Sequence, residues 1–308
     1  MADAERLVIG TRGSPLALAQ AHETQDRLAA AVGWSVEQLP LSLIKTTGDA
    51  IQDRPLSEAG GKGLFTKELD IALLTDAIDV AVHSAKDLPT AVPEGIAIAG
   101  YLPRADVRDA FISHRAKTLR ELPARATVGS ASLRRQAQVK RLRPDLNVAL
   151  LRGNVGTRLK KLESGDFDAT LLAMAGLSRL NLLDHVASVL DPDEFLPAVG
   201  QGAIALAIRS NDERVGAAVA KILHESTGLA LAAERAFLTV MDGSCRTPIA
   251  GYARLVDGVL RFRGQVLRPD GSESIEVLRE GSVGDAAALG RDAGLDLRAR
   301  MPADFLAS

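Results

Sequence analysis

One local pattern occurs twice in this sequence: a short apolar strand runs through a small polar turn into a capped helix. The first copy spans residues 7–19, where Ser14 can cap the helix and Pro15 suits its first turn. Gly33 is placed to end that helix. The second copy spans residues 127–135. Strands and helices that alternate in this way predict α/β lobes with largely parallel sheets.

The chain has 308 residues, more than one typical hydrophobic core, so two or three domains are expected. A strand at residues 36–44 is interrupted by Pro40 and should lie near a sheet edge. Residues 45–63 lack clear periodicity, and a helix is expected at about 64–74. A second α/β unit should begin after Pro103, with strands at residues 110–113, 127–129, 148–151, 169–172 and 203–208.

The character of the sequence changes after about residue 210. Helices are expected near 212–223, 227–240 and 285–301, and strands at 249–255, 259–267 and 274–279. Asp257-Gly258 between two of these strands is a strong hairpin signal. The C-terminal part should therefore be a small α+β domain with a three-stranded antiparallel sheet.

Composition excludes several classes of function. The formal charge of −2 gives no general attraction to nucleic acid or membranes, and 3% aromatic residues leave little surface for base stacking. No apolar run approaches 18 residues and no signal-peptide pattern precedes Leu7, so a cytoplasmic protein is expected. One cysteine, Cys245, and five scattered histidines predict neither an internal disulfide nor a protein-ligated metal.

The stretch IDVAVHSAKDLP, residues 78–89, is the first candidate site. A short apolar strand ends in a group of polar residues, and ligands bind at the carboxyl ends of strands in open α/β sheets. Taken alone, a solvated pair of Lys86 and Asp87 beside a loop is the more ordinary interpretation. The polar residues of this group are His83, Ser84, Lys86 and Asp87.

Two further turns carry arginines near a helix N-terminus. Arg134 and Arg135 follow Ser130-Ala131-Ser132, and Arg158 follows the turn Arg152-Gly153-Asn154. A basic residue is unfavourable at a helix N-terminus, so these arginines indicate a bound anion rather than helix design. The alternative is a solvated basic first turn. Two such turns favour one shared anionic ligand.

Three glycine-containing loops complete the candidates. Gly60-Gly61-Lys62-Gly63 fits a flexible loop better than an anion cradle, and Pro197 to Gly202 resembles a hinge around Gln201. Cys245 lies in a Gly/Ser/Pro loop beside Arg246, which favours exposure and a lowered thiol pKa over the usual role of a small buried hydrophobe. Catalytic nucleophile and covalent attachment point both remain open for this thiol.

Seven stretches together resemble the porphobilinogen deaminase family, also called hydroxymethylbilane synthases. The resemblance runs in order from residue 6 to the C-terminus and rests on TRGSPLALAQ, GGKGLFTKEL, DVAVHSAKDLPT, GSASLRRQAQ, RGNVGTRL, PAVGQGA and GSCRTPI. It implies a transferase of tetrapyrrole and haem biosynthesis. Such an enzyme joins four porphobilinogen molecules head to tail, releases four ammonia molecules and yields hydroxymethylbilane. The chain grows on a dipyrromethane primer that the family holds by a thioether to the cysteine matching Cys245.

The resemblance also implies roles for individual residues. Asp87 would stabilise positive charge on the pyrroles and move protons, with Lys86 beside it, and Gln201 matches the hinge glutamine. Each pyrrole ring carries an acetate and a propionate, which arginine forks suit. The implied cofactor-binding residues are Cys245, Ser84, Lys86, Asp87, Ser130, Ser132, Arg134, Arg135, Arg152 and Gly153. The implied substrate-binding residues are Arg12, Ser14, Lys62, Arg152, Arg158, Arg179 and Gln201. Glu58 departs from the family pattern, which is often basic at that position.

The architecture implied by the resemblance has two lobes like type II periplasmic binding proteins and a small C-terminal domain. Domain 1 would comprise residues 1–102 and about 200–220, domain 2 residues 103–199, and domain 3 residues 221–308 with Cys245. The active site would lie between the lobes. A monomer is implied, as is transfer of the product to uroporphyrinogen-III synthase.

Two other classes share part of these features. A two-lobed anion-binding protein would have the same strand-turn-helix anion sites but would release no ammonia from porphobilinogen. A lyase that uses Lys86 as a Schiff-base amine would be trapped on that residue by borohydride. A nucleic-acid role for Arg134 and Arg135 fits the overall charge poorly.

Overall fold

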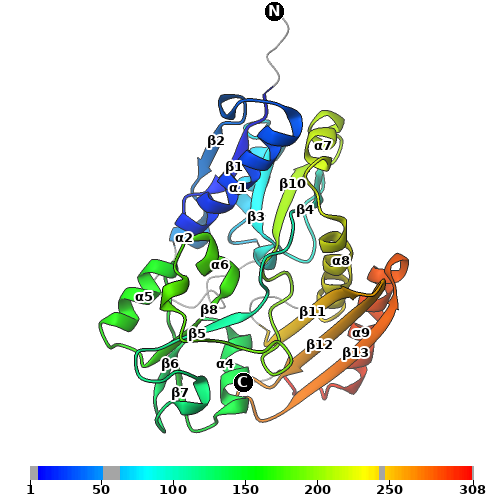
Figure 1. Ribbon diagram of the computed structural model, residues 1–308. Helices are drawn as coiled ribbons and strands as arrows, with labels where there is room; N and C mark the ends of the chain where they lie inside the picture. The colour runs from blue at the N-terminus through cyan, green and yellow to red at the C-terminus, as the bar shows by residue number, and fades with distance from the viewer. Residues whose placement is uncertain (1–5, 51–62, 243–246, 307–308) are drawn as a thin grey trace, which may run out of the picture. The chain divides into compact units, whose positions relative to one another are not determined.

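The computed structural model describes residues 6–50, 63–242 and 247–306. The chain divides into two compact units. The first unit contains the described residues up to Ala105 together with Ala203–Gly228. The second contains Asp106–Gly202 and the described residues from Leu229 onward. Figure 1 shows the elements that make up each unit.

The first unit is built on a five-stranded sheet in the order β2-β1-β3-β10-β4. Strands β2, β1 and β3 are parallel, and β10 runs antiparallel to both of its neighbours. The sheet is formed by β1 (Ile9–Arg12), β2 (Leu41–Ile44), β3 (Val80–Ser84), β4 (Ile96–Tyr101) and β10 (Ile204–Arg209). Because periodicity gives no partner for a strand, the pairing of β10 with β3 and β4 was not visible in the sequence pattern.

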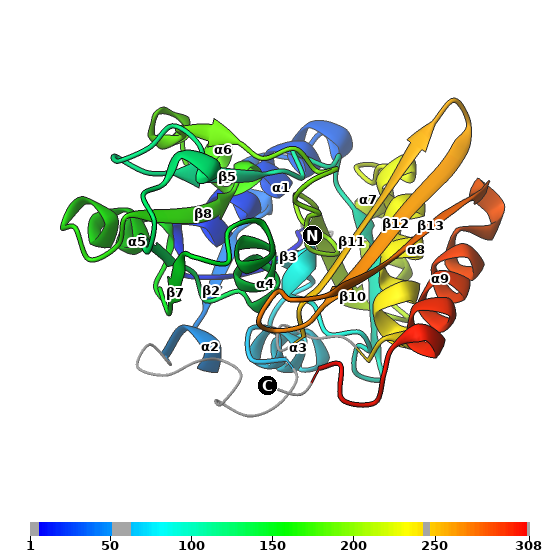
Figure 2. The same cartoon turned by 90° about the horizontal axis from the view of Figure 1, so that it is seen from below.

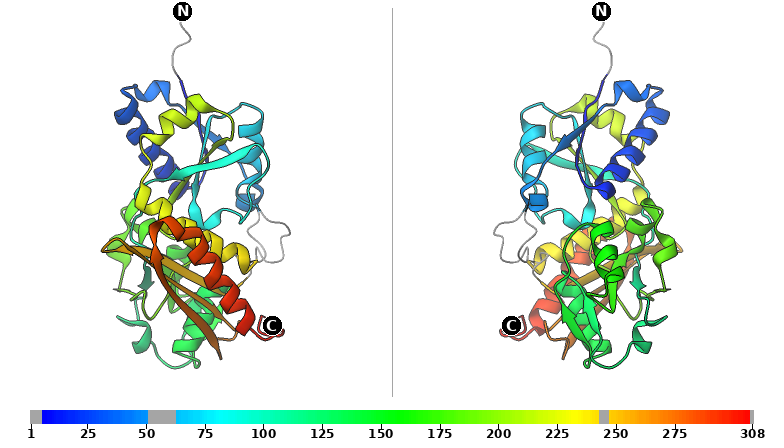
Figure 3. Two further views of the ribbon diagram at one scale, coloured as in Figure 1. Left: turned by 90° about the vertical axis from the view of Figure 1, so that its right-hand side faces the viewer. Right: turned by 90° about the vertical axis from the view of Figure 1, so that its left-hand side faces the viewer.

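Helices cover both faces of the first sheet. Val80 and Val82 of β3 lie in one core cluster with residues of α1 (Pro15–Val32) and α7 (Glu213–Ala220). Ala81, between them, lies in a second cluster with residues of α3 (Lys67–Leu74). Figure 3 shows α1 and α3 on opposite sides of the strands. A strand with both faces covered is buried throughout, which explains the unbroken apolar run before His83.

Local signals in the first unit hold in the structure, with two exceptions. The Ser14 side chain accepts a hydrogen bond from the Ala17 amide, and Gly33 ends α1 in a left-handed conformation at φ 75°. The single strand expected over residues 36–44 is wrong: Val36–Gln38 forms a 3-10 turn, and β2 begins only after Pro40, which has no amide to donate to a sheet. A short helix, α2 (Thr47–Ala50), lies where no periodicity was seen.

The second unit contains a sheet of the same plan, in the order β7-β6-β8-β5-β9. Strand β5 is antiparallel here, as β10 is in the first sheet. Its strands are β5 (Asp109–Ile112), β6 (Thr127–Gly129), β7 (Asn147–Ala149), β8 (Ala169–Ala173) and β9 (Ser188–Val189). Helix α4 (Leu133–Leu142) packs on one face, and α5 (Val155–Glu163) and α6 (Met174–Arg179) pack on the other.

The C-terminal part is a three-stranded antiparallel sheet with two helices on one face (Figure 2). It comprises α8 (Glu225–Val240), β11 (Ile249–Val256), β12 (Val259–Leu267), β13 (Ser274–Ser282) and α9 (Ala286–Arg300). Asp257 and Gly258 both have positive φ, as the turn of this hairpin requires. Two mixed α/β lobes and a separate three-stranded sheet confirm the expected fold class. None of the described helices is long and apolar enough to cross a membrane.

Candidate active site

Arg12 and Asp87 come together at the carboxyl ends of two neighbouring parallel strands in the first unit. Arg12 is the last residue of β1, and Asp87 ends the 3-10 turn that follows β3. Arg12 Nη1 lies 3.8 Å from Asp87 Oδ2. The same guanidinium binds Asp49 through two hydrogen bonds, of which the one from Nε measures 3.1 Å, and lies 4.0 Å from the centre of the Phe65 ring. These four residues are called the Arg12 cluster below.

The turn that carries Asp87 is fixed by its backbone. The Ala85 amide donates to the carbonyl of Ala203, the residue before β10, and the Leu88 amide donates to the Ala85 carbonyl. Ala85 and Leu88 are buried, whereas the side chain of Asp87 is 33% exposed and Lys86 is exposed. The buried positions therefore hold the turn while its charged side chains face outward.

Asp49 is held as a carboxylate. Burial acts to raise the pKa of Asp49, but hydrogen bonds from Arg12 and Thr46 outweigh it, so the pKa lies below its ordinary value. Thr46 Oγ1 donates to Asp49 Oδ2 at 2.8 Å. Asp49 is thus the main ionic partner of Arg12 in this cluster, a residue that sequence reasoning did not single out.

His83 does not act as a cation here. It is 5% exposed, and its Nε2 has no hydrogen-bond partner among the described residues. Burial, with a contribution from the positive charge of Arg12, lowers the pKa of His83 to about 4. The ring is therefore neutral at pH 7, and its place is in the interior of the sheet.

Two serines of the expected site are engaged within the first unit. Ser84 Oγ accepts from Gln20 Nε2 at 2.9 Å and lies 3.1 Å from Gln20 Oε1. Ser14 Oγ caps α1 at 3.3 Å from the Ala17 amide. Ser84 thus links the end of β3 to α1, whereas Ser14 caps that helix.

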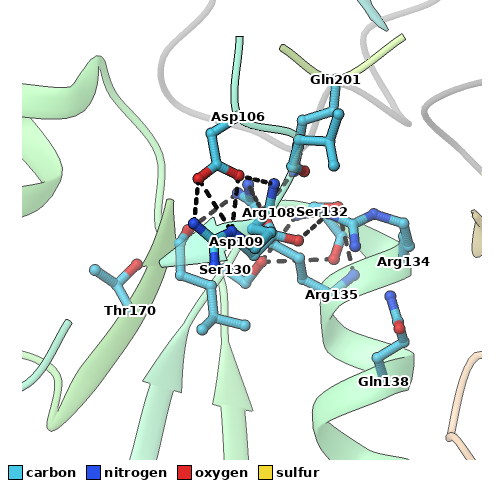
Figure 4. A network of polar contacts seen from close by, with 12 residues as sticks. Asp106, Arg108, Asp109, Ser130, Ser132, Arg134, Arg135, Gln138, Thr170 and Gln201 are labelled. Carbon is cyan, nitrogen blue, oxygen red and sulfur yellow. Dashed lines mark hydrogen bonds and ion pairs between the residues drawn. The ribbon is translucent and has the colours of Figure 1, made fainter. Parts of the chain in front are cut away.

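The second unit contains a buried network around Asp109, shown in Figure 4. Asp109 Oδ2 accepts from Arg134 Nη2 at 2.7 Å. Its Oδ1 accepts from Arg135 Nη2 at 2.6 Å and from Gln201 Nε2 at 3.0 Å. These four residues are called the Asp109 cluster below.

The charges of the Asp109 cluster do not balance. Asp109 is fully buried, and Arg134 and Arg135 are 4% and 6% exposed. Burial acts to raise the pKa of Asp109, but the two guanidinium groups outweigh it and hold the pKa far below its ordinary value. One carboxylate between two guanidinium groups leaves a net charge of about +1, which is costly in the interior unless a further anion approaches.

The structure gives the two arginines an internal partner. The sequence argument expected an external anion at Arg134 and Arg135 at the start of α4, and the structure shows that both guanidinium groups also bind Asp109, the first residue of β5. Arg134 Nη1 also donates to the Leu196 carbonyl at 2.7 Å. The buried Nε of Arg134 has no hydrogen-bond partner among the described residues. An aspartate at the start of an apolar strand was the sequence signal for this partner, and it was missed.

Ser132 caps α4 and Asn154 caps α5, and each helix is preceded by a turn that contains Ser130 or Gly153. Ser132 Oγ accepts from the Arg135 amide, and Ser130 Oγ accepts from the Ser132 amide at 3.1 Å. Asn154 caps α5, and Gly153 precedes it at φ 117°, a conformation that favours glycine.

Arg158 and Arg179 both point at backbone carbonyls. Arg158 Nε donates to the Gly153 carbonyl at 2.9 Å, and the Arg179 guanidinium lies 3.4 and 3.5 Å from the Gly202 carbonyl. Arg152, beside Gly153, is partly buried. These three arginines thus belong to the same unit as the Asp109 cluster.

Several predicted site residues fall outside the described parts of the chain. They include Cys245, Arg246, Lys62 and Glu58. The structure therefore does not place the thiol, the loop lysine or the glutamate that differs from the family pattern. Within residues 6–50, 63–242 and 247–306, no three His, Cys, Asp or Glu side chains are grouped to hold a metal ion.

Comparison with known proteins gives a consistent result over nearly the whole chain. A family model described as "Porphobilinogen deaminase, dipyromethane cofactor binding domain" matches residues 7–217, and one described as "Porphobilinogen deaminase, C-terminal domain" matches residues 229–299. Among solved structures the chain is similar to the methionine binding protein MetQ, with a TM-score of 0.45 and 12% identity over 71% of this chain and 89% of that one.

Curated relatives carry the same name. A porphobilinogen deaminase of Nitrobacter hamburgensis is 58% identical over 297 residues, which cover 96% of this chain and 94% of the relative. A porphobilinogen deaminase of Paracoccus denitrificans is 56% identical over 96% of this chain and 95% of its own length. The chain therefore belongs to the porphobilinogen deaminase family, the transferases that condense porphobilinogen into hydroxymethylbilane on a dipyrromethane cofactor.

Proposed function

We propose that Asp87 is the catalytic carboxylate of this transferase and that Lys86 assists it. The observation that supports this is the position of Asp87 at the end of β3, one-third exposed and 3.8 Å from Arg12. That distance is too long for a hydrogen bond. Arg12 donates two hydrogen bonds to Asp49 instead. The oxygens of Asp87 therefore keep their capacity to accept a hydrogen bond from a substrate N–H.

The chemistry needs a charged acceptor at this point. Loss of ammonia from porphobilinogen leaves positive charge on a pyrrole ring, and a carboxylate that accepts the pyrrole N–H stabilises that charge. Asp87 then takes the proton that leaves when the new carbon–carbon bond has formed. An amide in its place keeps the shape but loses both the charge and the basicity.

We also propose that Cys245, which lies outside the described residues, holds the dipyrromethane through a thioether. When bound, this cofactor supplies the terminal pyrrole carbon from which the chain grows. The second unit offers a donor set that fits its acetate and propionate groups. The support is the net positive Asp109 cluster and the partnerless Nε of Arg134.

The remaining binding roles are proposals on the same ground. Carboxylates of cofactor and substrate suit guanidinium forks and helix N-termini. We assign cofactor contacts to Ser84, Ser130, Ser132, Arg134, Arg135, Arg152 and Gly153, and substrate contacts to Arg12, Ser14, Lys62, Arg152, Arg158, Arg179 and Gln201. Gln201 is 1% exposed and donates to Asp109, so its proposed contact is indirect, through the Asp109 cluster.

Asp87→Asn tests the catalytic assignment. Purified enzyme is mixed with porphobilinogen, denatured after short times, and weighed intact, so that the number of added rings is counted. We expect Asp87→Asn to retain the cofactor and to add rings at least about 100-fold more slowly. Asp79→Asn is the matched control, because Asp79 lies just before the start of β3 and binds the Val8 amide and Arg209. Ring addition at the normal rate in Asp87→Asn contradicts the proposal.

The same mass measurement tests the attachment point. Cys245→Ala should return the bare polypeptide mass, while the unchanged protein returns that mass plus two pyrrole units. A dipyrromethane increment on Cys245→Ala would place the thioether elsewhere.

The cellular setting is proposed from the resemblance alone: a cytoplasmic monomer, with domain limits near residues 102, 199 and 221, that passes its product to uroporphyrinogen-III synthase.

A further inference from the structure

The Asp109 carboxylate has no role in the chemistry described so far, yet it is engaged by several donors in the interior of the second unit. It is fully buried and accepts four hydrogen bonds, from Arg134, Gln201 and twice from Arg135. A carboxylate has about four lone-pair sites, so its accepting capacity is filled by protein donors. Asp109 is therefore not available to bind a ligand itself.

The same bonds fix the orientation of both guanidinium groups. Arg135 is held at Nε and Nη2 by Asp109, at 3.1 and 2.6 Å, and its Nη1 donates to the Leu171 carbonyl at 3.0 Å. Arg134 is held at Nη2 by Asp109 and at Nη1 by Leu196. A guanidinium held at both ends does not rotate, so the remaining Arg134 Nε–H keeps a fixed direction. That Nε is buried and has no partner within the described residues.

We propose that Asp109 is a positioning residue for this reaction. Its carboxylate neutralises one of the two arginine charges and holds both guanidinium groups in place. The cluster therefore binds one carboxylate group of the ligand rather than two. This proposal rests on the proposed function, in which Arg134 and Arg135 bind carboxylates of the pyrrole chain. Gln201 serves Asp109 in turn, because its amide donates to the Asp109 Oδ1 atom and to the Val107 carbonyl.

Removal of the Asp109 charge gives a specific expectation. Asp109→Asn replaces one carboxylate oxygen by an NH2 group and removes the negative charge, so one fork loses its acceptor and the two guanidinium charges repel each other. Misplacement of a binding group by about 1 Å can cost about 100-fold in rate. We expect kcat/KM of Asp109→Asn to fall by about that factor, with a smaller fraction of purified protein carrying the dipyrromethane mass.

A double-mutant cycle separates positioning from general loss of structure. Because Asp109 acts through both guanidinium groups, Asp109→Asn should cost about 100-fold alone but only a few-fold in a background that carries both Arg134→Ala and Arg135→Ala. Asp168→Asn is the matched control: it removes a carboxylate of the same sheet that binds the Thr127 amide and Arg115. Its kcat/KM per folded molecule should stay near normal. Equal costs of Asp109→Asn in both backgrounds overturn the proposal.

A second variant covers the case in which Asp109→Asn fails to fold. Gln201→Leu leaves the Asp109–arginine bonds in place and removes one donor from Asp109. We expect a loss of kcat/KM in the same direction but smaller, which again vanishes in the background that carries both Arg134→Ala and Arg135→Ala. A loss that persists there overturns the proposal. If Arg134→Ala and Arg135→Ala themselves add rings normally, the carboxylate-binding function of the arginines is wrong instead.

Discussion

At the scale of single residues, Arg12 contacts two carboxylates in different ways, and the difference supports the role proposed for Asp87. Asp49 forms two hydrogen bonds to the guanidinium and is held charged, whereas Asp87 lies 3.8 Å away and one-third exposed. The bidentate partner satisfies most of the charge of Arg12. Asp87 thus lies near a cation without a hydrogen bond to it, which suits the proposed role of accepting from the N–H of each incoming ring.

His83 gives a prediction about pH and stability. Its pKa is lowered from 6.5 to about 4 in the folded state by burial and by the charge of Arg12. Between these values the unfolded chain binds the proton and the folded chain does not, so protonation favours unfolding. The folded state should lose stability as the pH falls from about 6.5 towards 4, by a few kcal/mol in all.

The measurement compares denaturant unfolding at pH 7 and pH 4.5 for the protein and for His83→Gln. Glutamine has no proton to gain, so the variant should show a smaller fall in unfolding free energy across this interval. Asp109 does not account for this difference, because its pKa is lowered in the folded state and its contribution to the unfolding free energy is lost only at lower pH. Identical pH dependence of the unfolding free energy in both proteins would show that His83 does not cause the loss of stability.

At the scale of elements, close packing of α8 and α9 holds the C-terminal sheet together. A Cβ added at Gly290 of α9 would lie 1.9 Å from the Ala233 carbonyl oxygen of α8. Backbone cannot yield as a flexible side chain can, so the helices would have to separate. The apolar contacts beneath them, including Phe237 on Phe262 at 5.0 Å between ring centres, would then loosen.

Gly290→Ala should therefore lower the unfolding free energy by about 1–3 kcal/mol or more. Gly228→Ala is the control within α8, since nothing lies within 4 Å of its added Cβ and alanine favours a helix by up to about 1 kcal/mol. Denaturant unfolding of both variants gives the comparison. Equal stability of the two would show that α9 shifts without cost.

The sequence predicted most elements of this fold but not all of their pairings. Strand β12 and the Asp257-Gly258 turn have the expected bounds, because a hairpin is specified locally by alternation and turn chemistry. The place of β10 between β3 and β4 is a nonlocal pairing that no periodicity encodes. Asp109 escaped for a similar reason: its partners are 25 and 26 residues away and become neighbours only when β5 and α4 fold together.

At the scale of the whole molecule, the enzyme must serve a ligand that changes length while the protein's own residues stay the same. Each added ring brings two more carboxylates, so the total negative charge to be held rises at every step. Cationic groups lie on several elements: Arg12 ends β1, Arg134 and Arg135 begin α4, and Arg158 lies in α5. Under the proposed function, groups on separate elements meet different rings of the growing chain.

Arg152→Ala should consequently stall elongation at a particular ring number rather than weaken every step alike. Intact mass spectra taken during turnover should show one enzyme-bound adduct accumulating several-fold over the others. Arg261→Ala is the control, because Arg261 on β12 pairs with Glu280 and is about half exposed; its adduct distribution should match that of the unchanged enzyme. A uniform slowing in Arg152→Ala, with all adducts in their usual proportions, would mean that Arg152 acts on overall affinity, and the idea of a carboxylate contact specific to one stage would be wrong.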